Sequence, residues 1–240
     1  MTTQMPHVNT VAPLTNVGLC LSLLEFIINR PSHVPGIGCF YGRPGLGKTT
    51  AATHLSARYQ AYYVECKKVW NTKALLLNIL KKMGLKEYFK KPMYEMLDAI
   101  TEELANSRRP LIIDDVQHLT RKKSIDIIRD IYDGSDKSPV LLIGEQMLRN
   151  ELKEFDTFDS RIGRYVEALP ADLDDISHVA RLYAPEIEIA EDLLKKIMKD
   201  SRGSLRRVGT AVEEVSEKAA TLGATQISLK EWGSNSFFSE

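Results

Sequence analysis

The sequence has no excess of charge of either sign, because its 32 lysines and arginines balance 32 aspartates and glutamates. No global field therefore draws the protein to nucleic acid or to a membrane, and any site for a polyanion must be a local patch. No apolar run approaches the ~20 residues that span a bilayer. The N-terminus lacks a basic stretch followed by an apolar one, which excludes a secretory signal. These absences predict a cytoplasmic protein with no membrane partner.

Cysteine is scarce as well, with only Cys20, Cys39 and Cys66 in 240 residues. An odd number of widely spaced cysteines without a CxxC pair excludes a disulfide framework and disfavours a metal site built on thiolates. We expect reduced thiols. The sequence also contains no internal repeat and no low-complexity tract.

Short apolar runs alternate with helical patterns through the first two thirds of the chain. Such alternation is typical of an α/β fold, in which helices cover both faces of a parallel sheet. We expect five strands, at residues 36–41, 61–65, 110–115, 140–144 and 165–169.

The pattern changes after Pro170, because residues 172–222 show only helical periodicity, in three segments. This change predicts a second, all-helical domain. The expected organisation is an N-terminal segment with one helix, a core, a helical lid and a tail, at residues 1–35, 36–170, 171–225 and 226–240.

A glycine-rich loop lies between the first expected strand and the next helix. Its sequence matches the P-loop pattern, in which glycines let backbone N–H groups surround phosphate oxygens and the helix N-terminus adds its dipole. Lys48 would reach the β- and γ-phosphates of ATP, and the Thr49 hydroxyl would hold Mg²⁺. The expected nucleotide-binding residues are Gly42, Arg43, Pro44, Gly45, Leu46, Gly47, Lys48, Thr49 and Thr50.

Two acids end the third expected strand, 65 residues after Thr49. Asp114 suits the Walker B carboxylate that orients the Mg²⁺ shell, and Asp115 would polarise the attacking water. A P-loop kinase acting on a metabolite is an alternative, but nothing in the sequence resembles a phosphate-acceptor pocket. The pair of acids favours an ATPase.

With these two elements placed, residues 10–225 resemble the AAA+ ATPases. Within them the chain is similar to the DNA-transposition type, typified by the B protein of transposing phage Mu. The resemblance rests on residues 42–50 and 111–119, and less specifically on 141–145 and 203–207. It implies a P-loop AAA+ core with a five-stranded parallel sheet, a small helical lid, and ATP bound between subunits of a homo-oligomer, either a ring or a filament.

Several catalytic roles follow only from this resemblance. Arg161 matches the arginine finger that reaches the γ-phosphate of a neighbouring subunit, with Arg164 as the competing candidate. Arg206 matches the lid arginine that senses the nucleotide. Asp115 stands where the family has glutamate, and Glu145 stands where it has a neutral polar residue. Both departures predict slow hydrolysis that acts as a switch, and replacing Asp115 with glutamate should then raise turnover.

Two basic clusters occupy places that line the channel in related ATPases. They consist of Lys67, Lys68 and Lys73 and of Arg121, Lys122 and Lys123. Lysine and arginine neutralise phosphates without reading sequence. The resemblance thus implies an ATPase that assembles on double-stranded DNA without sequence specificity and recruits or activates a transposase or recombinase. The alternatives are a replication loader, another AAA+ regulator, or an assembly protein with negligible hydrolysis.

Overall fold

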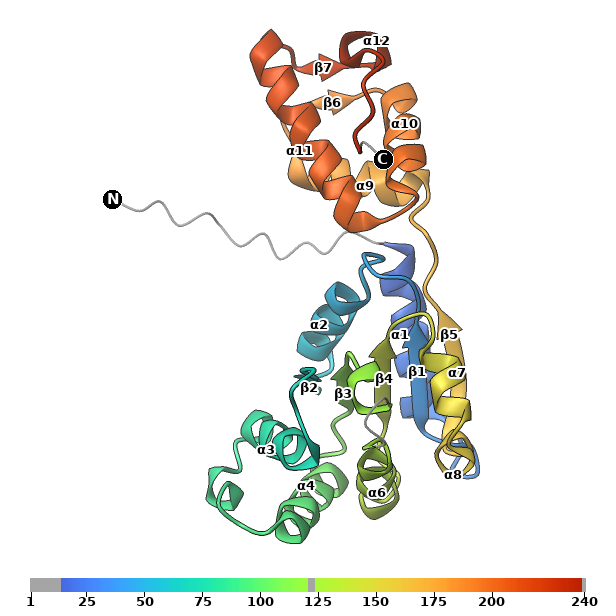
Figure 1. Ribbon diagram of the computed structural model, residues 1–240, viewed down its shortest axis with the longest axis vertical. Coiled ribbons are helices and arrows are strands. Elements are labelled where there is room, and N and C mark those ends of the chain that lie inside the picture. The colour runs from blue at the N-terminus through green and yellow to red at the C-terminus, as the bar shows by residue number, and fades with distance from the viewer. Residues whose placement is uncertain (1–13, 121–123, 239–240) are drawn as a thin grey trace, which may run out of the picture. The chain divides into compact units, whose positions relative to one another are not determined.

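The computed structural model describes residues 14–120 and 124–238. Contacts divide the described chain into two compact units, which we call the sheet unit, Asn16–Leu169, and the helical unit, Pro170–Phe238 with Leu14 and Thr15. Figure 1 shows the elements of both units. None of the helices in these described ranges is long and apolar enough to cross a membrane.

A five-stranded parallel sheet forms the centre of the sheet unit, with the strand order β2-β3-β4-β1-β5. This confirms the expected fold class. In chain order the elements are α1 (Thr15–Asn29), β1 (Ile37–Tyr41), α2 (Lys48–Arg58), β2 (Tyr62–Glu65), α3 (Thr72–Met83), the 3-10 helix η1 (Lys86–Tyr88), α4 (Met93–Ser107), β3 (Leu111–Asp114), α5 (Gln117–Thr120), α6 (Asp126–Gly134), β4 (Val140–Gly144), α7 (Leu148–Lys153), α8 (Asp156–Asp159) and β5 (Ile162–Glu167).

The strand β5 differs from the expected range of residues 165–169, because it begins at Ile162 and ends at Glu167. Gly163 and Arg164 interrupt the apolar run there, so the sequence pattern conceals the first half of the strand. Pairing with β1, which joins Ile37 to Ile162, holds these residues in the sheet. Backbone pairing with β1 therefore determines where β5 begins, and the pattern of apolar side chains does not.

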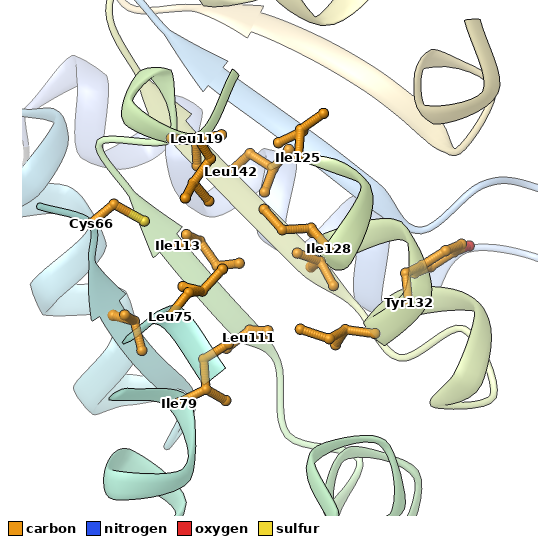
Figure 2. Packing of buried hydrophobic residues seen from close by; sticks show 14 of the residues in the cluster. Cys66, Leu75, Ile79, Leu111, Ile113, Leu119, Ile125, Ile128, Tyr132 and Leu142 are labelled. Carbon is orange, nitrogen blue, oxygen red and sulfur yellow. The ribbon is translucent and has the colours of Figure 1, made fainter. Parts of the chain in front are cut away.

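Alternating side chains of the central strands are buried on both faces of the sheet, as period-2 geometry requires. Ile112 packs in a cluster with α1 and α2, whereas Leu111 and Ile113 pack in a larger cluster with α3, α4 and α6. Figure 2 shows this larger cluster, in which strand residues lie opposite Leu75 of α3 and Ile128 of α6. The two cores fix the strand ends that carry the P-loop and the two acids.

The helical unit contains α9 (Leu173–Tyr183), α10 (Glu191–Ser201) and α11 (Leu205–Leu222), which match the three expected helical segments. The all-helical expectation needs one correction. Two-residue strands, β6 (Glu188–Ile189) and β7 (Gln226–Ile227), pair in parallel, and α12 (Leu229–Trp232) follows them. Strands of two residues are too short for any alternation to be visible in the sequence.

The C-terminal residues pack on the helical unit. Phe237 is 6% exposed, and its ring stacks on Trp232 with 4.4 Å between ring centroids. Both side chains belong to the core cluster of this unit. Residues of the segment expected as a tail therefore close the hydrophobic core of the helical unit.

Candidate functional site

The phosphate-loop candidate follows β1 and leads directly into α2. Gly45 and Gly47 both have a φ of 82°, a left-handed conformation that glycine adopts without a steric penalty. Leu46 between them is buried among residues of α1 and α2. The loop is thus anchored by one apolar side chain, while the first turn of α2 offers N–H groups that have no partner within the helix.

Lys48 is the first residue of α2, and its side chain folds back across the loop. Its ammonium donates to the carbonyl oxygen of Gly42 at 2.8 Å and to that of Arg43 at 2.9 Å. A lysine cation held over a glycine loop favours phosphate oxygens as further acceptors. The geometry fits the predicted role of Lys48.

Asp114 ends β3 and is 1% exposed. Its carboxylate accepts hydrogen bonds from the Tyr63 hydroxyl at 3.0 Å and from the Asp115 backbone N–H at 2.8 Å. Burial raises the pKa of the Asp114 carboxyl, and the nearby Thr49 hydroxyl and the Asp115 N–H oppose that rise. The structure therefore brings together the two residues that the sequence predicts as the magnesium site.

The donor set at this point fits magnesium. Mg²⁺ prefers oxygen ligands and is usually bound through one or two carboxylates together with substrate phosphates. Thr49 and Asp114 supply a hydroxyl and a carboxylate beside the glycine loop. Across residues 14–120 and 124–238 no group of three or more histidines, cysteines, aspartates or glutamates could hold a metal.

Asp115 follows β3 in a left-handed conformation, with a φ of 56°. Its carboxylate accepts a hydrogen bond from the side-chain amide of Gln117 at 3.1 Å. Glu145 follows β4, and its backbone N–H donates to the same amide of Gln117 at 3.3 Å. The two residues that depart from the family pattern are thus connected through a residue that the sequence analysis did not single out.

Arg161 lies at the amino-terminal ends of the parallel strands, whereas the glycine loop lies at their carboxyl-terminal ends. Its carbonyl oxygen accepts from the N–H of Ile37 at 3.2 Å, beside the first residue of β1, whereas Gly42 follows the last one. Since β1 has five residues, its ends are roughly 13–16 Å apart at ~3.3 Å per residue. Arg161 is therefore placed away from the glycine loop of its own chain.

The two candidate arginine fingers have different partners. Arg161 forms an ion pair with Asp133 at 3.0 Å, and both side chains are more than one third exposed. The guanidinium of Arg164 stacks on Phe26 of α1, with 3.8 Å from its central carbon to the ring centroid. Arg206 is an exposed residue in the first turn of α11, in the helical unit, so its role as a nucleotide sensor stays a prediction.

The predicted DNA-binding lysines follow β2 at the edge of the sheet. Lys67 forms an ion pair with Glu65, the residue that pairs with Asp114 in the β2–β3 register. Lys73 lies in the first turn of α3, after the partly buried Trp70. Lys68 lies between them in the loop. Arg121, Lys122 and Lys123 lie outside the described residues.

The sequence analysis missed three polar residues that support the site. They are Asn16, Tyr63 and Gln117. The buried side chain of Asn16 donates to the carbonyl oxygens of Leu46 at 2.9 Å and of Leu169 at 2.7 Å. Nothing in the local sequence distinguishes these residues from ordinary polar ones, because each acts through the position that packing gives it.

Comparison with known proteins agrees with this geometry. A family model described as an AAA domain matches residues 32–152, which are 121 of the 240 residues. A search of curated proteins found no match. Among solved structures, Cdc6p from Pyrobaculum aerophilum is similar with a TM-score of 0.64 and 18% identity, over 96% of this chain and 66% of that one.

Two further structures show the same likeness. A mutant form of RuvB from Thermotoga maritima has a TM-score of 0.62 and 20% identity, over 92% of this chain and 68% of that one. A signal transduction ATPase with numerous domains, from Pyrococcus horikoshii, has a TM-score of 0.55 and 17% identity, over 79% of this chain and 28% of that one. The chain thus spans about two thirds of the Cdc6p and RuvB chains, and the likeness at these identities shows the fold.

Proposed function

Because this chain belongs to the AAA domain family, and is an ATPase on that ground, we propose that it binds ATP with Mg²⁺ at residues 42–50 and assembles on double-stranded DNA. In this proposal the assembled protein recruits or activates a transposase or recombinase, and slow hydrolysis ends the assembly. The observation that carries the proposal is the separation of two half-sites at opposite ends of the parallel strands. The glycine loop, Thr49 and Asp114 lie at the carboxyl-terminal ends of the strands, and Arg161 lies at the amino-terminal ends.

The residues at the carboxyl-terminal ends of the strands suit nucleotide hydrolysis. The ammonium of Lys48 would exchange its two carbonyl partners for phosphate oxygens, and Thr49 with Asp114 would hold the cation. Bound Mg²⁺ neutralises charge on the phosphates when it is present. Asp115 would accept a proton from the attacking water, a role for which its carboxylate needs a fixed orientation.

Arg161 at the amino-terminal ends is proposed to complete the site of a neighbouring subunit. Its guanidinium is half-exposed and donates to Asp133, to the Thr157 carbonyl oxygen and to the Ser160 hydroxyl. A phosphate group in place of Asp133 would keep the bidentate pairing that suits a guanidinium. Arg164 is the weaker candidate, because its planar face is already occupied by Phe26.

Slow hydrolysis is supported by the two departures at the strand ends. Asp115 is one methylene shorter than glutamate, and misplacement by ~1 Å can cost about a hundredfold in rate. The left-handed backbone of Asp115 supplies a physical reason for the shorter side chain, since aspartate is among the residues that tolerate this conformation. An assembly protein with negligible hydrolysis is the second candidate, which the same two departures favour.

Contact with DNA is proposed for the lysines after β2. A chain with no net charge needs a local cluster to attract a polyanion, and Lys67, Lys68 and Lys73 lie on one edge of the sheet unit. Binding through phosphates would weaken steeply with salt. The ion pair of Lys67 with Glu65 would be exchanged for a phosphate in that complex.

The test is sedimentation of the pure protein with and without duplex DNA, in ADP and in a non-hydrolysable ATP analogue. We expect large particles only with DNA and the ATP analogue. Lys48→Ala should prevent this assembly, and so should Arg161→Ala, while the matched variant Arg164→Ala should retain it. ATP turnover, measured on the same samples, separates a slow ATPase from an assembly protein that does not hydrolyse.

Two results would overturn the proposal. A protein that stays monomeric in every condition leaves Arg161 without a nucleotide to reach and points to a monomeric P-loop enzyme. Assembly in ATP that is indifferent to DNA and to salt would remove the role of the lysines after β2 and favour another AAA regulator.

A further inference from the structure

Gln117 is a buried polar residue beside the proposed catalytic carboxylate. It is the first residue of α5 and is 2% exposed. A primary amide taken out of water without partners is costly, so its hydrogen bonds determine where it can lie. Its N–H donates to Oδ1 of Asp115 at 3.1 Å, and its carbonyl oxygen accepts from the N–H of Glu145 at 3.3 Å.

These two partners fix the orientation of the amide. A carboxylate can only accept and a backbone N–H can only donate, so the nitrogen must face Asp115 and the oxygen must face Glu145. Flipping the amide would break both bonds. Gln117 therefore connects the end of β3 to the end of β4 in one arrangement only.

Close packing holds the amide against β4. A methyl group on Gly144 would lie 2.7 Å from the amide oxygen of Gln117, which means that the glycine leaves the space that the amide occupies. The carbonyl oxygen of Gly144 in turn accepts from the N–H of Gly42 at 3.3 Å. The amide thus lies where β3, β4 and the glycine loop come together.

The chemistry of the amide suits a base that must be oriented and remain basic. A neighbouring lysine or arginine would also hold the Asp115 carboxylate, but a positive charge lowers a carboxyl pKa and weakens the base. A neutral N–H fixes Oδ1 with a smaller effect on basicity. The orientation of Oδ2, the other carboxylate oxygen, is then set by the same bond.

We infer that Gln117 is a positioning residue, which holds Asp115 in the orientation that hydrolysis requires and ties that orientation to the end of β4. The inference rests on the proposed role of Asp115 in the ATPase reaction. It predicts that loss of the amide slows turnover while nucleotide binding is retained, because the phosphate contacts of Lys48 and Thr49 do not involve Gln117.

The experiment compares five full-length proteins: wild type, Gln117→Leu, Gln117→Glu, Asp115→Asn and the double variant Asp115→Asn with Gln117→Leu. For each, kcat and KM for ATP are measured with DNA, together with the Kd of a fluorescent non-hydrolysable ATP analogue and the melting temperature. We expect Gln117→Leu to lower kcat by about 10- to 100-fold, as a displacement approaching 1 Å would. The Kd should stay within about twofold.

The Gln117→Glu variant separates the hydrogen bond from the packing. Its carboxylate fills nearly the same space and can still accept from the N–H of Glu145, but it has no N–H to donate to Asp115. We therefore expect kcat to fall as in Gln117→Leu while the Kd of the analogue is retained, a split that a merely structural role would not produce. This nearly isosteric variant also keeps the test valid if the leucine variant fails to fold.

The outcomes separate this inference from the proposed function. If Asp115→Asn leaves kcat unchanged, the catalytic role of Asp115 is wrong. If Asp115→Asn lowers kcat but Gln117→Leu does not, or if Gln117→Glu turns over like wild type, the positioning role is wrong. The two losses should not add in the double variant, since residues that act as one unit are non-additive, and full additivity would also refute the inference.

Discussion

Adding a single methyl group at Gly144 should disturb both stability and catalysis. The new carbon would lie 2.7 Å from the amide oxygen of Gln117 and 2.7 Å from a terminal carbon of Leu148. Non-bonded heavy atoms are most favourable at ~3.5–4.0 Å, so both neighbours must move away from the new carbon by roughly 0.8 Å each. Leu148 can change its rotamer, whereas Gln117 is held by two hydrogen bonds.

The magnitude follows from these distances. Overpacking a well-packed site costs about 1–3 kcal/mol. In a protein of this size each kcal/mol lowers the melting temperature by about 2–4 °C. The displaced amide carries Asp115 with it, and a shift near 1 Å can reduce turnover up to about a hundredfold. Gly144→Ala should therefore lower the melting temperature and reduce kcat in the same protein.

Thermal unfolding followed by circular dichroism and steady-state ATP turnover measure the two effects. Gly18→Ala is the matched control, because a methyl group at this helical glycine meets nothing within 4 Å and should stabilise the protein by about 0.5–1 kcal/mol. Combining Gly144→Ala with Gln117→Ala should restore part of the lost stability. If Gly144→Ala melts and turns over like wild type, the amide does not lie where we place it.

Two further predictions concern stability. Burial raises the pKa of the Asp114 carboxyl, so its charged form destabilises the fold increasingly as pH rises from the unfolded pKa of about 3.9 through the folded one. In denaturant unfolding at pH 7 without Mg²⁺, Asp114→Asn should thus have a larger free energy of unfolding than wild type. This gain should shrink towards pH 4. The variant should also lose the stabilisation that Mg²⁺ with ATP gives to wild type. An equal gain at both pH values would contradict this. Phe237→Ala should destabilise the helical unit by about 3–5 kcal/mol, because Phe237 is buried and stacks on Trp232. Hydrogen exchange of α9–α11 measures the loss, and the partly buried Phe238 provides the control, since its truncation should cost clearly less.

The sequence carried enough information to place the glycine loop, Asp114 and the family. A P-loop is defined by local spacing, and the strand–loop–helix order around it is visible in the apolar pattern. Thr49 and Asp114 could be expected to lie close together. Asp114 ends one parallel strand, Thr49 follows the loop after another, and the carboxyl ends of parallel strands lie on the same side of the sheet. The match to an AAA domain over residues 32–152 confirms the AAA family that the motifs indicated, whereas the DNA-transposition type within it stays a prediction.

The supporting residues could not be found in the same way. Gln117 lies within residues 111–119, on which the resemblance partly rests, but its role depends on the approach of Glu145, which follows a different strand. The role of Tyr63 likewise depends on the neighbouring strand that carries Asp114. The partners of Arg161 and Arg164 were also invisible in the sequence, since the contacts with Asp133 and Phe26 arise only in the folded chain.

Asn16 has a consequence for how the glycine loop can be inherited or transferred between proteins. Its side chain joins Leu46, inside the glycine loop, to Leu169, the last residue of the sheet unit, and it also accepts from the Leu169 N–H at 2.9 Å. A module cut at the first strand would keep every recognisable motif and leave three backbone groups, two of them on the half-exposed Leu169, without this partner. The smallest transferable module therefore begins with α1, so recombination that respects only the motifs would deliver a loop without its support.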